Sequence, residues 1–297
     1  MTLRGSSLTV DVRFRCWPAR ERLAFLSGGV NIQRMSNESE KRSQSPWFEH
    51  TSQIKRPILR LFVFPYAGGS VQAFQSWSGY FPVEVDLCLV NLPGHGKRFG
   101  ERAFVRLTRL VEVLADQIAC EIQPPFIFYG HSMGALVSFE LARELFRRYG
   151  DGPSHLFLSG HGAPHLPKSE PDTFNLPDSE FIANLKRLNG TPLQLLNDPE
   201  ARQIFLPMLR ADFEVVNTYE YRDAQPLLCP LSIYGGLQDM DVPVASLSAW
   251  EVHTSATCKV RLFEGDHFFI HDSRSEFVQI LRNDVLSGYP SGGFIAG

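Results

Sequence analysis

The strongest constraint on the fold of this chain is a series of short apolar segments that alternates with longer helical patterns from Ile58 onward. Most of the short segments are continuously apolar, which is typical of strands buried on both faces. Parallel strands need crossover connections, so the alternation predicts a mostly parallel sheet flanked by helices in an α/β fold. We expect strands at residues 59–64, 85–90, 126–129, 155–159, 231–234 and 260–263, and helices at residues 107–122, 133–149, 243–253 and 275–286.

The regular alternation stops between residues 164 and 226, where helical patterns at 178–188 and 199–219 follow each other without a strand pattern. This predicts a helical lid inserted at about residues 165–226. The second pattern carries more apolar surface than a lone solvent-facing helix needs. Packing against the core accounts for most of it, and a share could line an apolar channel beneath the lid. These apolar residues are Ile204, Phe205, Met208, Leu209, Phe213, Val215 and Val216.

Three segments are expected along the 297 residues. Residues 56–285 form the α/β domain, residues 1–55 an N-terminal extension and residues 286–297 a C-terminal tail. The extension has weak periodicity, and its acidic residues disfavour an organelle transit peptide. We expect it to be flexible or to reflect a misassigned start, because the polar run after Met35 is typical of an ordinary N-terminus.

Composition and charge exclude several classes of protein. The formal net charge is −3 and the pI is near 6.3, so general attraction to nucleic acid or to an anionic membrane is not expected. The sequence has no bilayer-length apolar run and no apolar secretory segment, which predicts a cytoplasmic location. Five scattered cysteines without a C-x-x-C pair argue against a disulfide framework or a zinc site. We expect a monomer that binds no metal and no cofactor.

The pentapeptide GHSMG at residues 130–134 lies between an expected strand and an expected helix. This is the setting of a nucleophile elbow, in which flanking glycines let the turn close and expose the central hydroxyl. An ordinary Gly-rich turn is the alternative, but the strand and helix on either side favour the elbow. The pattern predicts a serine hydrolase with Ser132 as its nucleophile.

A serine hydroxyl needs a histidine to accept its proton and a carboxylate to orient that histidine. His267 follows the last expected strand and is the strongest candidate. His271 is its nearest rival, although the apolar residues before it suggest that the chain has returned to packed structure. His131 adjoins the serine on a sharp turn and is expected to point elsewhere.

The carboxylate is expected at the carboxyl edge of the sheet, where sites gather in such folds. Asp239 follows the strand at 231–234 through a short Gly-containing turn and is our choice. Spacing alone leaves Asp241 open, with helix capping as its structural alternative. Asp266 adjoins His267 and is poorly placed to reach its ring. The order serine, acid, histidine is that of α/β-hydrolases.

Two backbone N–H groups are needed to stabilise the oxyanion of an acyl-transfer reaction. One is expected from Met133, immediately after the nucleophile. The other must come from an earlier loop. The segment 65–70 follows the first strand, and its paired glycines permit unusual backbone angles, so we expect Ala67 to be the second donor.

Six separate motifs along about residues 46–285 carry a family resemblance. They are PWF at 46–48, FPYAGG at 64–69, LPGHG at 92–96 with Arg98 and Glu101, GHSMG at 130–134, GG at 235–236 with Asp239 and Trp250, and GDHFF at 265–269. Together they resemble the type II thioesterases, free-standing α/β-hydrolases that accompany nonribosomal peptide and polyketide synthases. In that family pattern Ser132, Asp239 and His267 fall on the catalytic triad, and Ala67 and Met133 on the oxyanion hole.

The resemblance implies hydrolysis of thioesters on the phosphopantetheine arm of acyl or peptidyl carrier proteins, which removes misprimed or stalled acyl groups. The phosphopantetheine arm that carries the substrate then belongs to the carrier protein, and no separate cofactor is implied. The chain departs from the family at His95, where arginine is more common, and at Asp266, where glycine is common. Neither departure touches the triad.

Two alternatives remain open. A fatty-acyl chain terminator, lipase or carboxylesterase would use the same chemistry on another substrate, and an acyl chain-length profile would distinguish these. The second alternative is an inactive α/β-hydrolase that serves as a binding scaffold. The intact serine, histidine and acid positions disfavour it. Carrier proteins tend to be acidic, which suggests basic docking residues such as Arg143, Arg147 and Arg148, but a solvated helix face is the explanation that we favour for these arginines.

Overall fold

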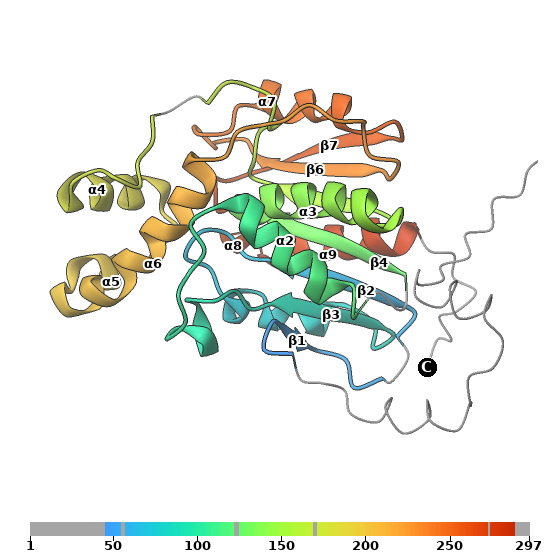
Figure 1. Cartoon of the computed structure of the whole chain (residues 1–297), viewed down its shortest axis with the longest axis horizontal. Coiled ribbons are helices and arrows are strands. Elements are labelled where there is room, and N and C mark those ends of the chain that lie inside the picture. Colours follow the sequence, from blue (N-terminus) through green and yellow to red (C-terminus); the bar gives the residue numbers. More distant parts are fainter. Residues whose placement is uncertain (1–44, 55–56, 122–124, 169–170, 273, 289–297) are drawn as a thin grey trace, which may run out of the picture. The chain divides into compact units, whose positions relative to one another are not determined.

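The computed structural model describes residues 45–54, 57–121, 125–168, 171–272 and 274–288. Within them a seven-stranded sheet has the order β1-β3-β2-β4-β5-β6-β7 (Figure 1). Its strands are β1 (Phe48–His50), β2 (Leu59–Phe64), β3 (Val85–Val90), β4 (Phe126–His131), β5 (Leu156–Ser159), β6 (Leu231–Gly236) and β7 (Cys258–Phe263). All neighbours are parallel except β1 and β3. The predicted α/β-hydrolase fold with a mostly parallel sheet is confirmed.

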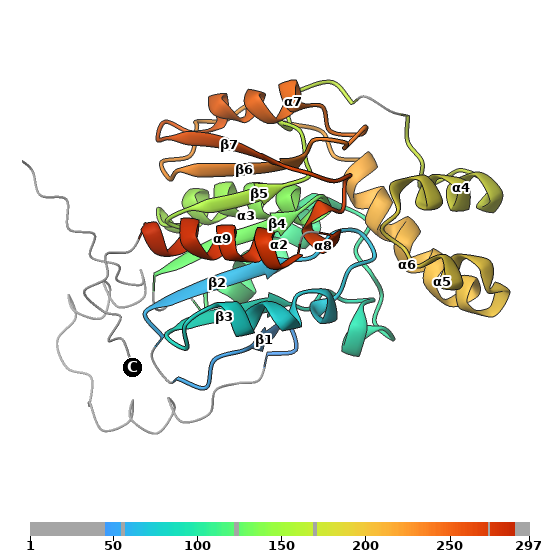
Figure 2. The same ribbon diagram turned by 180° about the vertical axis from the view of Figure 1, so that it is seen from behind.

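Helices cover both faces of the sheet. Successive side chains of β2 alternate between two cores: Phe62 and Phe64 pack in one with α2 and α3, whereas Leu61 and Val63 pack in the other with η3 and α9. Figures 1 and 2 show these two layers from opposite sides. The covering helices are α2 (Leu107–Ile118), α3 (Met133–Tyr149), α7 (Val244–Ser248), α8 (Phe269–Asp272) and α9 (Arg274–Ser287), with the 3₁₀ helices η2 (Val71–Ala73), η3 (Gln75–Tyr80), η4 (Gly96–Arg98) and η5 (Ala249–His253).

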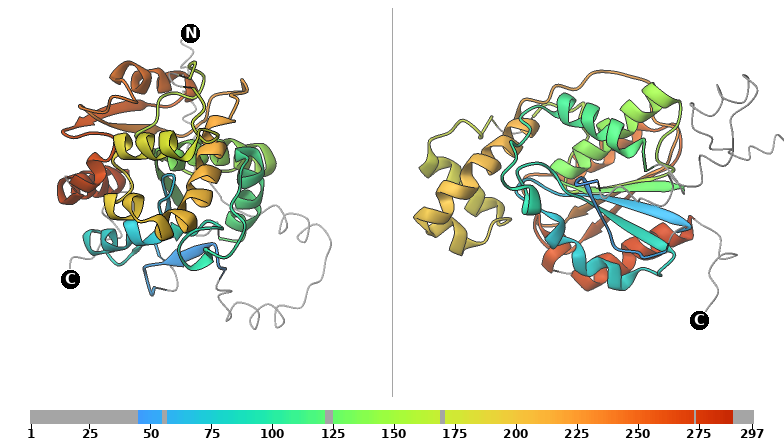
Figure 3. Two further views of the ribbon diagram at one scale, coloured as in Figure 1. Left: turned by 90° about the vertical axis from the view of Figure 1, so that its left-hand side faces the viewer. Right: turned by 60° about the horizontal axis from the view of Figure 1, so that its bottom comes forward.

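Three helices lie beside the sheet and form a unit that we call the cap: α4 (Asp178–Leu188), α5 (Leu193–Asn197) and α6 (Pro199–Asn217) (Figures 1 and 3). They occupy the region where the sequence predicts a lid. The start of α6 is fixed by Asp198, whose side chain accepts hydrogen bonds from two backbone N–H groups, with Pro199 in the first turn. The cap has its own apolar cluster: Phe181, Ile182, Leu185, Leu196, Leu206, Met208 and Leu209.

Several boundaries differ from the sequence expectation. Residues 45–54 were expected in the N-terminal extension, but Phe48–His50 forms β1 and pairs with β3. Three residues are too few for a periodic signal. The expected helix at 243–253 is a short α-helix followed by a 3₁₀ helix. The strand β7 is not buried on both faces, because it lies at the sheet edge, where Val260 is 38% exposed.

Other expectations concern residues that the structure does not describe. Residues 1–44, which include Met35, and residues 289–297 lie outside the described residues. The nature of residues 1–44 and the start of the chain therefore stay predictions. Among the described helices, none combines the length and the apolar character that crossing a membrane requires.

Candidate active site

Ser132 occupies the sharp turn between β4 and α3. Its backbone has φ 53° and ψ −116°, a conformation that is rare for a residue with a side chain. Its own N–H donates to the carbonyl of Ser159 on the neighbouring strand, at 2.8 Å. The strand, turn and helix that the sequence predicts around this serine are therefore present.

The two glycines of the pentapeptide are required by close backbone contacts. A Cβ atom on Gly130 would lie 2.1 Å from the carbonyl oxygen of Gly134. A Cβ atom on Gly134 would lie 2.3 Å from the carbonyl oxygen of Phe64 at the end of β2. Any larger residue would push α3 away from the strands, so the glycines bring the helix N-terminus against the sheet edge.

His267 reaches Ser132 from the loop after β7. Its Nε2 lies 3.0 Å from the Ser132 hydroxyl oxygen, and its Nδ1 lies 2.8 Å from Oδ2 of Asp239. A carboxylate can only accept, so Nδ1 carries the proton and Nε2 is left to accept from the serine hydroxyl. The three side chains come from three separate strand ends of the same sheet edge.

Asp239 is oriented by its own loop. Its Oδ1 accepts hydrogen bonds from the backbone N–H groups of Asp241 and Val242, at 3.0 and 3.1 Å, which leaves Oδ2 for His267. The residue is 8% exposed, so this carboxylate has little contact with water. Asp241, the alternative that spacing left open, instead forms an ion pair with Arg187 of the cap.

The other candidates for histidine and acid are engaged elsewhere. The Nε2 of His271 lies 2.9 Å from the hydroxyl of Tyr66. His131 is fully buried beside Ser159, and burial lowers its pKa well below the ordinary value, so its ring is neutral. Asp266 accepts from the backbone N–H of Phe268 and from the side chain of Asn189.

The two expected oxyanion donors are the backbone N–H groups of Ala67 and Met133. Gly69 N–H donates to the carbonyl of Tyr66 at 2.8 Å, closing a four-residue turn around Ala67. Within the described residues, neither the N–H of Ala67 nor that of Met133 donates to a protein acceptor. Both groups are therefore available to a ligand oxygen, Met133 at the favourable N-terminal end of α3.

A cavity of about 740 Å³ lies against Ser132 and His267 and beneath the cap. Its apolar wall includes Leu136 of the core and Phe213 and Val216 of α6. Such a mixture of apolar surface with a few polar groups is typical of small-molecule sites. Among the described residues no cluster of three or more His, Cys, Asp or Glu side chains is arranged to hold a metal.

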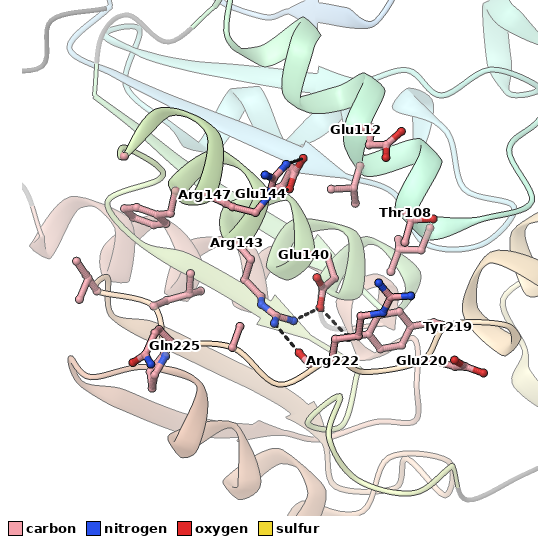
Figure 4. Close-up of a pocket in the computed structure, with 18 of the residues that line it drawn as sticks. Thr108, Glu112, Glu140, Arg143, Glu144, Arg147, Tyr219, Glu220, Arg222 and Gln225 are labelled. Atoms are coloured by element: carbon pink, nitrogen blue, oxygen red, sulfur yellow. Dashed lines mark hydrogen bonds and ion pairs between the residues drawn. The ribbon is translucent and has the colours of Figure 1, made fainter. Parts of the chain in front are cut away.

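A second cavity, of about 980 Å³, lies between α2, α3 and the segment that follows α6, and Ser132, Asp239 and His267 do not line it. Figure 4 shows Arg143 in this cavity pointing toward Glu140, and the ion pair measures 2.6 Å. Arg147 and Arg148 both pair with Glu144. Each arginine suggested for carrier docking is thus paired with an acid, and only Arg147 of the three has a mostly exposed side chain.

Sequence reasoning missed a buried polar contact between the cap and the core. Asp212 on α6 lies 2.8 Å from Nε2 of His95 and 2.7 Å from the backbone nitrogen of Gly68. Both side chains are almost fully buried. The available signal was that Asp212 falls on the apolar face of α6, with Leu209 one turn before it and Val215 one turn after it, and a buried polar partner explains this position.

Comparison with known proteins identifies the family of this chain. A family model described as a thioesterase domain matches residues 59–284. The gramicidin S biosynthesis protein GrsT of Aneurinibacillus migulanus is 43% identical over 235 residues, which is 79% of this chain and 92% of that protein.

Two of the matching solved structures cover a similar share of this chain. The RedJ thioesterase from the prodiginine pathway of Streptomyces coelicolor has a TM-score of 0.72 at 33% identity, covering 77% of this chain and 91% of that chain. YbtT, a type II thioesterase from the yersiniabactin NRPS/PKS pathway, has a TM-score of 0.68 at 33% identity, covering 76% of this chain and 92% of that chain. This chain therefore belongs to the thioesterase family of serine hydrolases, among the type II thioesterases.

Proposed function

We propose that this type II thioesterase hydrolyses acyl and aminoacyl thioesters on the phosphopantetheine arm of carrier proteins, with Ser132, His267 and Asp239 as its catalytic triad. The observation that carries the proposal is the continuous hydrogen-bonded series from the serine hydroxyl through the imidazole to the carboxylate, at 3.0 and 2.8 Å, beside a cavity of about 740 Å³.

In the first half of the reaction Ser132 Oγ attacks the thioester carbonyl while His267 Nε2 takes the hydroxyl proton. The charge on the carbonyl oxygen is stabilised by the N–H groups of Ala67 and Met133. The carbon–sulfur bond then breaks, and the thiolate of the arm leaves with the proton from His267. The product is an ester between the acyl group and Ser132, together with the free thiol.

The second half repeats these steps with water. His267 removes a proton from a water molecule, whose oxygen attacks the ester carbonyl of the acyl-enzyme. The same two N–H groups receive the negative charge. His267 then returns the proton to Ser132 Oγ, and the carboxylic acid is released. Asp239 stabilises the imidazolium in both halves and keeps its Nδ1–H pointing away from the serine.

The substrate class rests on two arguments. A relative at 43% identity over 79% of the chain is a gramicidin S biosynthesis protein, and YbtT belongs to an NRPS/PKS pathway, where acyl groups are carried as thioesters. The apolar wall of the cavity, formed by Leu136, Phe213 and Val216, suits the acyl part of such a substrate.

The experiment compares carrier-bound and free thioesters. A carrier protein is loaded with acetyl, medium-chain or aminoacyl groups and mixed with wild-type protein or with Ser132→Ala, and deacylation is followed by intact mass. The matching coenzyme A thioesters are the control for carrier recognition. We expect release that needs Ser132 and is faster from the carrier than from coenzyme A.

Each other outcome contradicts a different part of the proposal. Activity on free esters without carrier thioesterase activity would retain the hydrolase and remove the carrier. Release that persists in Ser132→Ala would refute the nucleophile. A sharp preference for medium acyl chains would favour the chain-terminating alternative, and a folded but inactive wild-type protein would favour the scaffold.

A further inference from the structure

The buried carboxylate of Asp212 connects the cap to two loops of the core. Its Oδ2 accepts the backbone N–H of Gly68, at 2.7 Å, and also faces Nε2 of His95, at 2.8 Å. Asp212 is 3% exposed and His95 is 2% exposed, so this contact is shielded from water. A buried carboxylate is costly unless it is paired, and here both partners belong to the core.

The Gly68 contact fixes a peptide next to the expected oxyanion donor. Ala67 and Gly68 are the two central residues of the turn that is closed by Gly69 N–H and Tyr66 C=O. Gly68 has φ +76°, as position i+2 of a type II turn requires. The peptide between Ala67 and Gly68 can flip in such turns, and the carboxylate of Asp212 accepts its N–H in one orientation only.

Both peptide planes around Ala67 are therefore held. The peptide before Ala67, which carries its N–H, is held through the carbonyl of Tyr66, and the peptide after it is held by Asp212. Helix α6 also packs directly on the turn, since a Cβ atom on Gly68 would lie 2.4 Å from the side chain of Leu209. Leu209 and Asp212 are one helical turn apart and face the same loop.

The ring of His95 is a cation in this arrangement. Its Nδ1 lies 3.1 Å from the carbonyl oxygen of Pro93 and its Nε2 faces Asp212, and both of these partners only accept hydrogen bonds. Both nitrogens must therefore carry protons. Burial favours the neutral ring, but the charge and hydrogen bond of Asp212 outweigh it and raise the pKa of His95 above its ordinary value.

We infer that Asp212 is a positioning residue for the oxyanion hole, and that protonated His95 holds its carboxylate in place. The cap then does more than roof the cavity, because the hole has its reactive geometry when α6 is docked on the turn. This inference rests on the proposed function, in which the N–H of Ala67 stabilises the oxyanion.

The first test separates turnover from binding. Asp212→Ala should lower kcat about 10²-fold, because a small displacement of a catalytic donor has that cost, whereas KM for a soluble acyl thioester should change little. Asp212→Asn keeps an acceptor for Gly68 and should recover a large part of the loss. Asp178→Asn is the matched control, since it removes an acid that pairs with Arg210 within the cap.

The second test uses pH. Among the described residues Asp212 is the charged group that faces the His95 ring from the packed elements, while Arg98 and Glu101 of its own loop pair with each other. The raised pKa means that His95 is charged below it and loses its proton as pH rises, so wild-type kcat should fall at alkaline pH. His95→Arg stays charged and should lose this alkaline decline.

The outcomes distinguish this inference from the proposed function. If Ser132→Ala abolishes turnover but Asp212→Ala keeps wild-type kcat, the positioning role is wrong and the triad stands. An alkaline decline that is unchanged in His95→Arg would also overturn it. If Asp212→Ala fails to fold, judged by circular dichroism, the Asp212→Asn and His95→Arg variants decide. Turnover that survives Ser132→Ala would instead remove the proposed function itself.

Discussion

The sheet edge and the cap position their side chains by different means. At the sheet edge, the turn around Ser132 is set by strand register and by glycines that contact neighbouring backbone. The cap has a small apolar cluster of its own, packs Leu209 on the oxyanion turn and contacts the active-site loops through individual polar side chains. These are Asp212 to Gly68, Arg187 to Asp241 and Asn189 to Asp266.

The two regions therefore differ in how easily they can move. Ser132, the proposed nucleophile, lies on backbone that cannot shift without disrupting the sheet. Each cap contact, by contrast, reaches one of the three loops of the site: the oxyanion turn, the loop after β6 and the loop after β7. The exposed contacts of Arg187 with Asp241 and of Asn189 with Asp266 can be broken and reformed at low cost, whereas the buried contact of Asp212 keeps α6 docked on the oxyanion turn.

The largest expected effect is on the triad itself. Asp239→Asn should lower kcat about 10⁴-fold, because an amide cannot stabilise the imidazolium and favours the wrong tautomer of His267. Pre-steady-state thioester hydrolysis measures the loss. Asp241→Asn is the control and should remain near wild type, since its side chain pairs with Arg187 and not with His267. Equal losses in the two variants would contradict the assignment of the acid.

The next effect tests the backbone of the sheet edge. Gly134→Ala should lower the free energy of unfolding by about 4 kcal/mol or more, because its Cβ would overlap the carbonyl oxygens of Phe64 and Pro65 at the end of β2. Gly79→Ala is the control, since a Cβ there meets nothing within 4 Å and should change stability by about 0.5 kcal/mol or less. Urea unfolding compares them. Similar midpoints would mean that the elbow is less constrained than its contacts indicate.

The same contrast explains what the sequence could predict. Ser132 was identifiable because its signal is local, a glycine pattern between a strand and a helix. His267 and Asp239 followed because parallel strands bring their carboxyl ends to one edge, although spacing could not separate Asp239 from Asp241. The strand β1 was missed because it has three residues.

The contact between His95 and Asp212 shows the limit of such reasoning. The two residues are 117 positions apart, and neither lies in a local pattern that names its partner. Amphipathic periodicity predicts that α6 is a helix and which face is apolar, but not which core loop this face meets. Tertiary docking decides that, and one sequence contains no signal for it.

A third prediction concerns the independence of the cap. Phe181→Ala should lower the free energy of unfolding of the cap by about 3–5 kcal/mol. Phe181 is fully buried in the cap cluster and packs edge to face on Phe213. Hydrogen exchange should lose protection in α4 and α6 and keep it in β2 and β4. Equal loss in the sheet would show that cap and core unfold as one unit.

The smallest effect should come from the exposed cap contact. Arg187 is 44% exposed in its ion pair with Asp241, whereas Asp212 is almost fully buried. Exposed pairs contribute about 0–1 kcal/mol, so Arg187→Ala should change both the unfolding midpoint and kcat only slightly. Steady-state assays on one soluble thioester compare it with Asp212→Ala. If Arg187→Ala lowers kcat as strongly as Asp212→Ala does, then burial does not determine how much each cap contact affects kcat. The pair of Arg187 and Asp241, at the loop after β6, would then also position catalytic groups.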